Sequence, residues 1–349
     1  MSTHNKVRLI LHVGAGKTGT TSIQETLRLG QEKLLSRKIW YLGLMLENAN
    51  ILYSWQRPTT VNQDFHALPG EARVAQIVTV MRQVIDRAKA KDIDTLVWSN
   101  ESFFDTNADV LAALSSLRAD LDITVIAYVR RHDKWASSAY VQWGMRHKTY
   151  SGAIRPFREW MKTGVPKFSE RLKVFIDADI DRFLIRNLDS VKDSVADFLE
   201  LLQIGTLGLV AQRSNESSNS VELFLRALFN NQLRQPALPA LFDRVVGRGL
   251  YTSKSPQHFL ENLLPNAADL EAARKQCQED KDRVDSILAN AGQPPLSADE
   301  IELGEQSFSQ EQLAFSLSKI VLAQAIRLER LEHTLKKLQE SHPSEDNSG

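Results

Sequence analysis

The sequence predicts a three-layer α/β fold, with a parallel central sheet between helices and a helical extension toward the C-terminal end. Apolar runs typical of buried strands alternate with helical patterns, the order found in parallel sheets that are covered on both faces. A turn rich in Gly and Thr, residues 14–22, follows the first apolar run. Strand signals stop beyond Phe229, where Pro236, Pro239 and Pro265 interrupt a mainly helical stretch. The sheet is therefore expected in the N-terminal part of the chain.

The individual elements follow from local patterns. Apolar runs predict strands at residues 7–13, 38–43, 94–101, 122–130 and 181–188. Apolar residues at helical spacing, or the position directly behind a strand, predict helices at residues 21–35, 71–90, 132–140 and 197–205. Residues 47–70 contain Pro58 and the pair Pro69-Gly70, so we expect an irregular segment there. This segment is a candidate for a loop that binds the substrate.

The turn after the first strand has the composition of a phosphate-binding loop. It places Gly14, Gly16, Gly19 and a single lysine, Lys17, immediately before a helix. Backbone N–H groups at a helix N-terminus bind anions, and a lysine adds positive charge. Hydroxyl donors in the same turn are Thr18, Thr20, Thr21 and Ser22. These residues predict a P-loop-like fold that binds a nucleotide phosphate.

The spacing of this loop differs from the Walker A motif. That motif, G-x-x-x-x-G-K-[ST], would need a glycine at position 11, which is Leu11. The run from Lys17 to Ser22, Lys-Thr-Gly-Thr-Thr-Ser, instead resembles the 5′-phosphosulfate loop of sulfotransferases that use 3′-phosphoadenosine 5′-phosphosulfate (PAPS). The resemblance implies that residues 16–22 bind the 5′-phosphosulfate. The alternative is a glycine-rich turn with a surface lysine.

A second segment fits the same family. Arg130 ends an apolar run, and Ser138 lies eight residues later in the expected helix. In sulfotransferases an Arg and a Ser at this spacing bind the 3′-phosphate of the donor, so the resemblance assigns that role to Arg130 and Ser138. PAPS carries phosphate at both ends of its adenosine, which requires two anion sites. Surface capping is the alternative explanation for an arginine at a strand end.

Further matches extend the resemblance over residues 7–230. The run Ser99-Asn-Glu101 ends a strand where relatives often have Ser-Ser-Glu, and the turn at residues 213–219 resembles the Asn-x-Ser-rich turn of the family. The resemblance adds Arg213 to the expected donor-binding residues. The animal signature Gly-x-x-Gly-Asp-Trp-Lys-Asn is absent from the sequence, so the match is to the bacterial type.

The chemistry expected of such an enzyme assigns roles to three residues. Lys17 would neutralise the charge that develops on the oxygen bridging to the 5′-phosphate. Glu101, at the end of its strand, is the first candidate for the base that removes the acceptor proton, and His12 is the second. Glu101 could instead cap a helix or pair with a donor-site cation, and His12 could be structural. We expect no metal, because no acidic cluster has metal-ligand spacing.

Composition narrows the class of protein. Among 349 residues, Lys+Arg and Asp+Glu both number 43, which gives no reason to expect nucleic-acid binding. Cys277 is the single cysteine, so an intramolecular disulfide is excluded. The sequence has neither an apolar run of membrane-spanning length nor a signal-peptide pattern at its N-terminus. We therefore expect a cytoplasmic protein without a membrane span.

The last helix has a heptad pattern. One heptad position holds Ala314, Val321, Leu328 and Leu335, and the other holds Leu317, Gln324, Leu331 and Leu338. This helix either packs on its own domain or pairs with a partner helix, as in a homodimer. The expected division is a nucleotide-binding domain at 1–230, a helical extension at 231–300, an amphipathic helical segment at 301–340 and a disordered tail at 341–349.

The function expected from the resemblance is transfer of a sulfuryl group from PAPS to a hydroxyl or amine, with 3′,5′-ADP as the second product. A carbohydrate or glycolipid acceptor is an expectation from the family alone. Two alternatives stay open. Gly16-Lys17-Thr18 favours a P-loop kinase or NTPase, and the heptad helix favours a non-catalytic nucleotide-binding protein.

Overall fold

A computed structural model describes residues 6–57, 61–148, 150–204, 220–233, 235–246, 263–297, 299 and 309–341. The chain forms two compact units, and each unit is built from three separate segments. The first unit comprises residues 1–136, 165–215 and 271–300, and the second comprises residues 137–164, 216–270 and 301–349. The linear division expected from the sequence, with a boundary at residue 230, differs from this arrangement.

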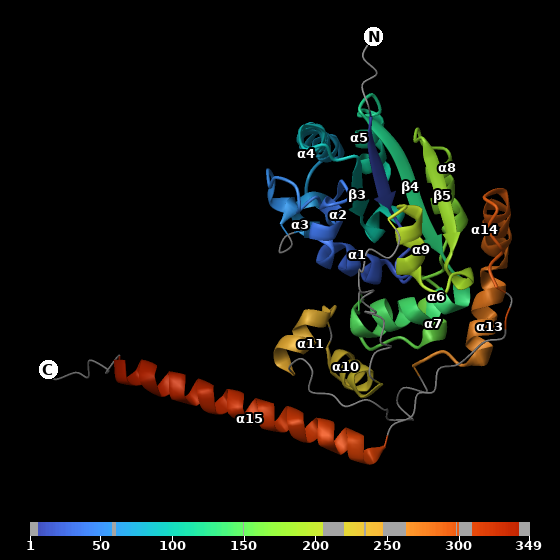
Figure 1. Ribbon diagram of the computed structural model, residues 1–349. Coiled ribbons are helices and arrows are strands. Elements are labelled where there is room, and N and C mark those ends of the chain that lie inside the picture. Colours follow the sequence, from blue (N-terminus) through green and yellow to red (C-terminus); the bar gives the residue numbers. More distant parts are fainter. Residues whose placement is uncertain are drawn as a thin grey trace, which may run out of the picture. The chain divides into compact units, whose positions relative to one another are not determined.

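The first unit contains a five-stranded sheet in which all strands are parallel, which confirms the predicted α/β class. The strand order is β2-β3-β1-β4-β5, and in Figure 1 the dark blue β1 lies between β3 and β4. Leu9 of β1 is paired with Leu96 of β3 on one side and with Ile123 of β4 on the other. The strands are Val7–His12, Ile39–Tyr41, Thr95–Ser99, Leu121–Val129 and Arg182–Asn187.

Helices cover both faces of the sheet. Successive side chains of a strand point to opposite faces, and the apolar residues of β1 therefore need a helical layer on each side. Leu9 and Leu11 belong to a core that includes residues of α4, α5 and α8, whereas Ile10 belongs to a second core with α1 and α9. These helices are Gly70–Ala90, Ala108–Ser115, Phe168–Ile176, Thr20–Leu29 and Ser194–Leu201. Both cores consist mainly of buried aliphatic and aromatic side chains.

The order of the connections identifies a pair of neighbouring strands, β1 and β4, beside which a ligand site is expected. The chain leaves β1 toward β2 through α1, and every later connection runs in the opposite direction through α4, α5 or α8. Right-handed crossovers in opposite directions must lie on opposite faces, as these helices do. The neighbours β1 and β4 therefore send their connections in opposite directions. In open α/β sheets, ligands bind at the carboxyl ends of such a pair.

Two expected segments differ in detail from the structure. The helix expected at residues 21–35 is divided at Gly30 into α1 and α2, Gln31–Leu35. The segment at 47–70 contains a short 3-10 helix, Ser54–Gln56, and a helix, α3, Val61–His66. The buried Gln56 side chain organises this segment, since it accepts from Leu52 N at 2.8 Å and donates to Leu46 O at 3.1 Å.

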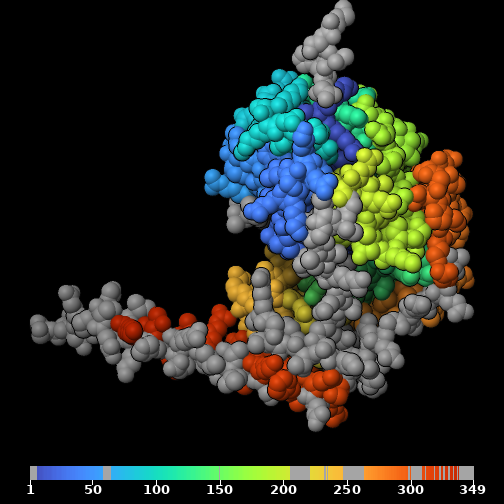
Figure 2. Space-filling model, viewed as in Figure 1, coloured from blue at the N-terminus to red at the C-terminus, as the bar shows by residue number. Residues whose placement is uncertain are grey.

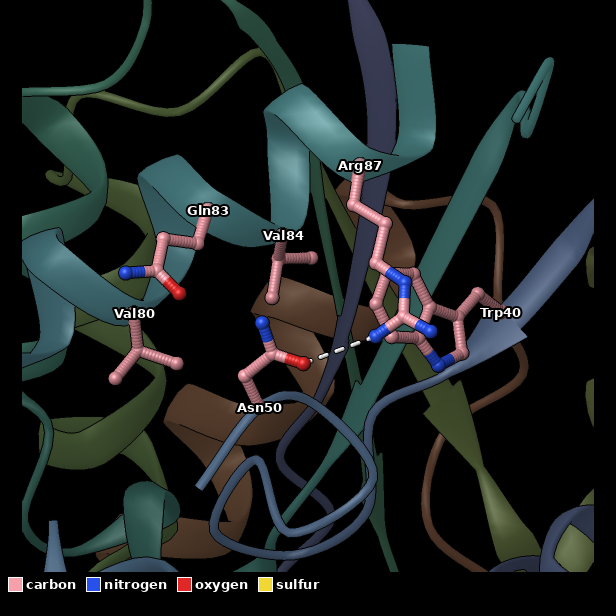
Figure 3. A pocket seen from close by; sticks show the side chains of 6 residues that line it. All are labelled: Trp40, Asn50, Val80, Gln83, Val84 and Arg87. Carbon is pink, nitrogen blue, oxygen red and sulfur yellow. Dashed lines mark hydrogen bonds between the residues drawn. The ribbon is translucent and has the colours of Figure 1, made fainter. Parts of the chain in front are cut away.

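A shallow depression lies between this segment and α4, and it is filled by its own side chains. Figure 3 shows the Arg87 guanidinium over the Trp40 ring, 5.2 Å from its centroid, and donating to Asn50 Oδ1 at 3.1 Å. Val80, Gln83 and Val84 complete the lining. These contacts attach the segment to α4, so we assign the depression a structural role.

The residues expected to form a separate helical extension are shared between the units. In the first unit, α14, Gln278–Asn290, packs on α8 and β5, and its Val284 and Leu288 are fully buried in the core. Figure 2 shows this orange helix against the yellow-green segment of the same unit. The helix is therefore part of the sheet-containing unit.

The second unit is helical in its described residues. Its core joins Val221 and Phe242 to Leu313 of the last helix. A buried ammonium group, Lys148 Nζ, donates to three backbone oxygens, including Asn230 O and Leu233 O, both at 2.8 Å. The main helices are α7, Phe157–Met161, α10, Ser220–Gln232, α11, Pro239–Val245, and α15, Gln310–Ser341. Among the described residues, no helix combines the length and apolar character needed to cross a membrane.

Candidate functional site

The loop between β1 and α1 turns three consecutive carbonyl groups toward the protein. Ala15 O accepts the Thr18 hydroxyl, Gly16 O accepts from Trp135 Nε1 at 2.9 Å, and Lys17 O accepts from Arg130 Nη1 at 3.0 Å. Lys17 has a φ of 71°, in the left-handed region. This conformation costs about 1 kcal/mol for a non-glycine residue, and the three carbonyl contacts compensate for it.

The N–H groups of the same loop remain available to a ligand. None of the hydrogen bonds between described residues is donated by the N–H of Gly16, Thr18, Gly19, Thr20 or Thr21. These groups surround the N-terminus of α1, a ten-residue helix with no acidic residue in its first turn. Such an array attracts an anion through hydrogen bonds and through the helix dipole.

Close packing explains two of the loop glycines. A Cβ atom on Gly14 would lie 2.9 Å from Thr18 Oγ1 and 3.1 Å from His12 Nε2. A Cβ atom on Gly19 would lie 2.5 Å from Oγ of Ser194, the first residue of α9. Gly19 also has a φ of 85°. Larger residues at these positions would displace the loop from its neighbours.

Arg130 and Arg131 follow β4 but have different surroundings. The Arg131 guanidinium forms a bidentate pair with the buried Asp133, at 2.9 and 2.6 Å. Within the described residues, Arg130 has no such carboxylate partner, and its buried Nε atom has no hydrogen-bond partner. Burial lowers the pKa of Arg130, although a guanidinium keeps its charge. An incompletely paired, half-buried cation next to Lys17 O is suited to binding an anion.

Glu101 lies at the carboxyl end of β3, the other neighbour of β1. Asn100 holds the turn, since its side-chain oxygen accepts from Ser102 N at 2.9 Å and its amide donates to Leu44 O at 3.0 Å. The half-buried Glu101 carboxylate accepts from Gln24 Nε2 at 2.8 Å. Gln24 belongs to α1, so the helix that follows the glycine-rich loop also orients this carboxylate.

His12 is buried beneath the loop. Its side chain is fully shielded from solvent, its ring packs against Tyr128 and Phe198, and its Nδ1 atom lies 2.8 Å from Ser99 Oγ. Burial lowers the pKa of His12 to about 3, so the imidazole is neutral. Although the buried Nε2 atom has no hydrogen-bond partner among the described residues, the lowered pKa disfavours His12 as a base and leaves Glu101 as the first candidate.

The other expected site residues divide into three groups. The Thr20 and Ser22 side chains are buried at the start of α1, whereas Thr21 is exposed. Ser138 lies near the end of α6, His132–Ala139, a helix that begins shortly after Arg130. Arg213 lies outside the described residues, so its expected role has no structural test. Among the described residues, no group of three or more His, Cys, Asp or Glu side chains could hold a metal ion.

Three contributors to this site were not expected from the sequence. Trp135 ties down Gly16 O, Gln24 orients Glu101, and Ser194 closes the space beside Gly19. Each acts across a long sequence separation, which for Trp135 and Gly16 is 119 residues. Residue type alone gives no signal for such contacts.

Comparisons with known proteins assign no family to this chain. No protein-family model matches the sequence. No curated protein matches it either. The case for a function therefore depends on the geometry of the site and on the motifs in the sequence.

Proposed function

We propose that this protein is a sulfotransferase that moves a sulfuryl group from PAPS to an acceptor. The main support is the β1–α1 loop, where three carbonyls face inward and five N–H groups are left for an anion, next to the incompletely paired Arg130. The two anion-binding features lie at the carboxyl ends of β1 and β4, the pair with opposite connections. The identification of PAPS as the donor is based on the resemblance of residues 17–22 to the 5′-phosphosulfate loop.

In this proposal the loop stabilises the leaving group. The bond between sulfur and the oxygen bridging to the 5′-phosphate breaks, a bond from the acceptor oxygen or nitrogen to sulfur forms, and 3′,5′-ADP leaves. Lys17 and the loop N–H groups neutralise the charge that collects on the bridging oxygen. Arg130 binds the 3′-phosphate at the other end of the nucleotide.

Glu101 receives the acceptor proton in this mechanism. The hydrogen bond from Gln24 occupies one of its oxygens and leaves the other for the acceptor hydroxyl or amine. Its position beside β1 is consistent with an acceptor that approaches from the β3 side of the loop. We propose a carbohydrate or glycolipid hydroxyl as the acceptor on the basis of the family resemblance.

One observation weighs against the P-loop kinase alternative. The residue after a P-loop lysine binds Mg²⁺ through its hydroxyl. The corresponding Thr18 is fully buried here, and its hydroxyl donates to Ala15 O. The burial of this hydroxyl supports a donor that needs no metal next to Thr18.

A transfer assay tests the proposal. The protein is incubated with PAPS labelled in the sulfuryl group and a panel of glycans and glycolipids, and labelled products are separated from donor. Sulfated product is expected without added Mg²⁺. Transfer of phosphate from γ-labelled ATP to the same panel, with no sulfuryl transfer, would instead identify a kinase.

A further inference from the structure

The last helix, α15, packs on its own unit through one side only. With Ala314 at heptad position a and Leu317 at position d, residues Leu313, Ile320 and Arg327 occupy position g. Leu313 and Ile320 pack against the second unit's core, and Arg327 Nη1 donates to Arg244 O at 2.9 Å. Apart from Gln324 at position d, whose amide donates to Val245 O, these contacts of α15 lie on the flank of the heptad seam, the stripe formed by positions a and d.

The heptad seam itself is left open to solvent. The exposed fractions are 67% for Val321, 59% for Leu328, 52% for Leu331 and 57% for Leu335. Ala314 and Leu317 are also exposed, and Gln324 is the one half-buried residue among the seam side chains that the structure describes. Isolated exposed apolar side chains are ordinary, but a continuous stripe of this length marks an interaction surface.

We propose that this seam binds the seam of a second copy of the same chain, as a parallel two-stranded coiled coil. The pattern spans four heptads, which is sufficient for a stable coiled coil. A homodimer pairs identical stripes, so every exposed Leu and Val of one helix meets its equivalent. The partner is thus another copy of this protein, whatever reaction the first unit catalyses.

The polar residues of the helix favour the parallel orientation. In a parallel pair, a g residue faces the e residue five positions later in the partner, which matches Arg327 with Glu332 in both directions. The single polar seam residue, Gln324, faces its own equivalent. One Gln324 N–H is donated to Val245 O at 2.5 Å, and the amide retains a second N–H and its oxygen for the partner. In an antiparallel pair Gln324 would face an apolar a residue.

Small residues stand where the partner helix needs space. In a parallel pair, position e of one helix lies beside position g of the other. In the first half of the helix, position e holds Ser318 and Ala325, and position g holds Leu313 and Ile320, which already contact the second unit's core. In the second half, position e carries Glu332 and Gln339. Position e therefore carries small residues in the half of the helix where position g packs on the second unit, and larger polar residues in the other half.

The mass of the full-length protein in solution tests the proposal. We expect about twice the 39.4 kDa chain mass by light scattering. The double variant Leu328→Glu/Leu331→Glu should be monomeric, because it places like charges at the centre of the seam. Both residues are exposed in one chain, so the fold should be retained. The matched control, Lys337→Glu, adds a carboxylate to the same helix off the seam and should remain dimeric. A monomeric wild-type protein, or a double variant that remains dimeric, would overturn the proposal.

A cysteine variant tests the orientation. In a parallel pair, Leu331→Cys places two identical thiols across the seam, so oxidation should give a disulfide-linked dimer on a non-reducing gel. The wild-type protein is the control, because its only cysteine, Cys277, is buried. A dimer that forms no disulfide with Leu331→Cys would contradict the parallel register.

Discussion

The β1–α1 loop and the β4–α6 junction both suit an anion, but they do so by different means. The loop contributes several N–H groups whose direction is set by carbonyls bound on the inner side, at Ala15, Gly16 and Lys17. The junction contributes one half-buried charge, Arg130, beside an arginine that is already paired. A set of fixed dipoles defines the position of a ligand closely, whereas a single charge mainly distinguishes ligands by their charge.

This difference predicts a division of labour along the nucleotide. The loop should act at the reacting end, where the position of the bridging oxygen decides the rate. The junction should act at the other end, where it discriminates a 3′-phosphorylated nucleotide from one without that group. Four substitutions test this division, and they follow from the largest expected effect to the smallest.

Lys17→Ala should have the largest effect, and the effect should be on the rate. Removal of a charge that stabilises the transition state should lower sulfuryl transfer by about 10³-fold. The measurement is single-turnover transfer at saturating PAPS. The control is Lys91→Ala, at an exposed lysine that ends α4. Turnover similar to wild type in Lys17→Ala would exclude the loop from the chemistry.

Glu101→Gln should lower transfer by roughly 10²-fold at neutral pH, because the amide cannot accept a proton. The hydrogen bond with Gln24 can be retained, so the affinity for 3′,5′-ADP should change little. The rate should also lose the acidic limb of its pH profile. If the variant instead binds 3′,5′-ADP weakly and transfers normally in a single turnover, then Glu101 is a structural anchor, and the buried His12 would be tested next.

Arg130→Ala should weaken binding of 3′,5′-ADP by roughly 10- to 100-fold, the value of a charge-assisted hydrogen bond. Binding of 5′-AMP should change far less, since it has no 3′-phosphate. Calorimetric titration of both nucleotides gives the ratio. Arg131→Lys is the matched control, because this residue pairs with Asp133, and it should keep the wild-type preference. Equal losses of affinity for the two nucleotides would mean that Arg130 does not bind the 3′-phosphate.

Trp135→Phe should have the smallest effect. It removes the N–H donated to Gly16 O but keeps an aromatic ring beside Phe168. We expect a decrease of about fivefold in transfer, corresponding to about 1 kcal/mol for one hydrogen bond. Trp55→Phe is the control, since it also loses one indole hydrogen bond, to Gln76 Oε1 at 2.7 Å. Equal decreases in both variants would mean that Trp135 contributes only to stability.

Local patterns were sufficient to predict the sheet and to place the candidate residues at the ends of its strands. The apolar runs around Leu9 and Ile123 identify buried parallel strands, and these lie where the sequence predicted them. Lys17, Glu101 and Arg130 each follow a strand, so the topology alone brings them to one edge of the sheet.

Contacts between distant segments could not be predicted in this way. The packing of α14 on α8 joins segments that are distant in the sequence, as the hydrogen bond from Ser169 N to Asp280 Oδ1, across 111 residues, shows. Trp135 reaches Gly16 only when β4 lies beside β1. The burial of His12 also depends on Phe198 of α9, which closes over the ring. A histidine before a glycine-rich loop therefore has the same sequence signature whether it is catalytic or structural.

A thermal-shift titration tests the central claim, that the site binds a nucleotide with phosphate at both ends and without a metal. We predict that 3′,5′-ADP raises the unfolding temperature of the wild-type protein in the absence of Mg²⁺, and that ATP does not. This stabilisation should increase with 3′,5′-ADP concentration, as expected for a ligand that binds only the folded state. Stabilisation by ATP and Mg²⁺ without any response to 3′,5′-ADP would contradict the assignment.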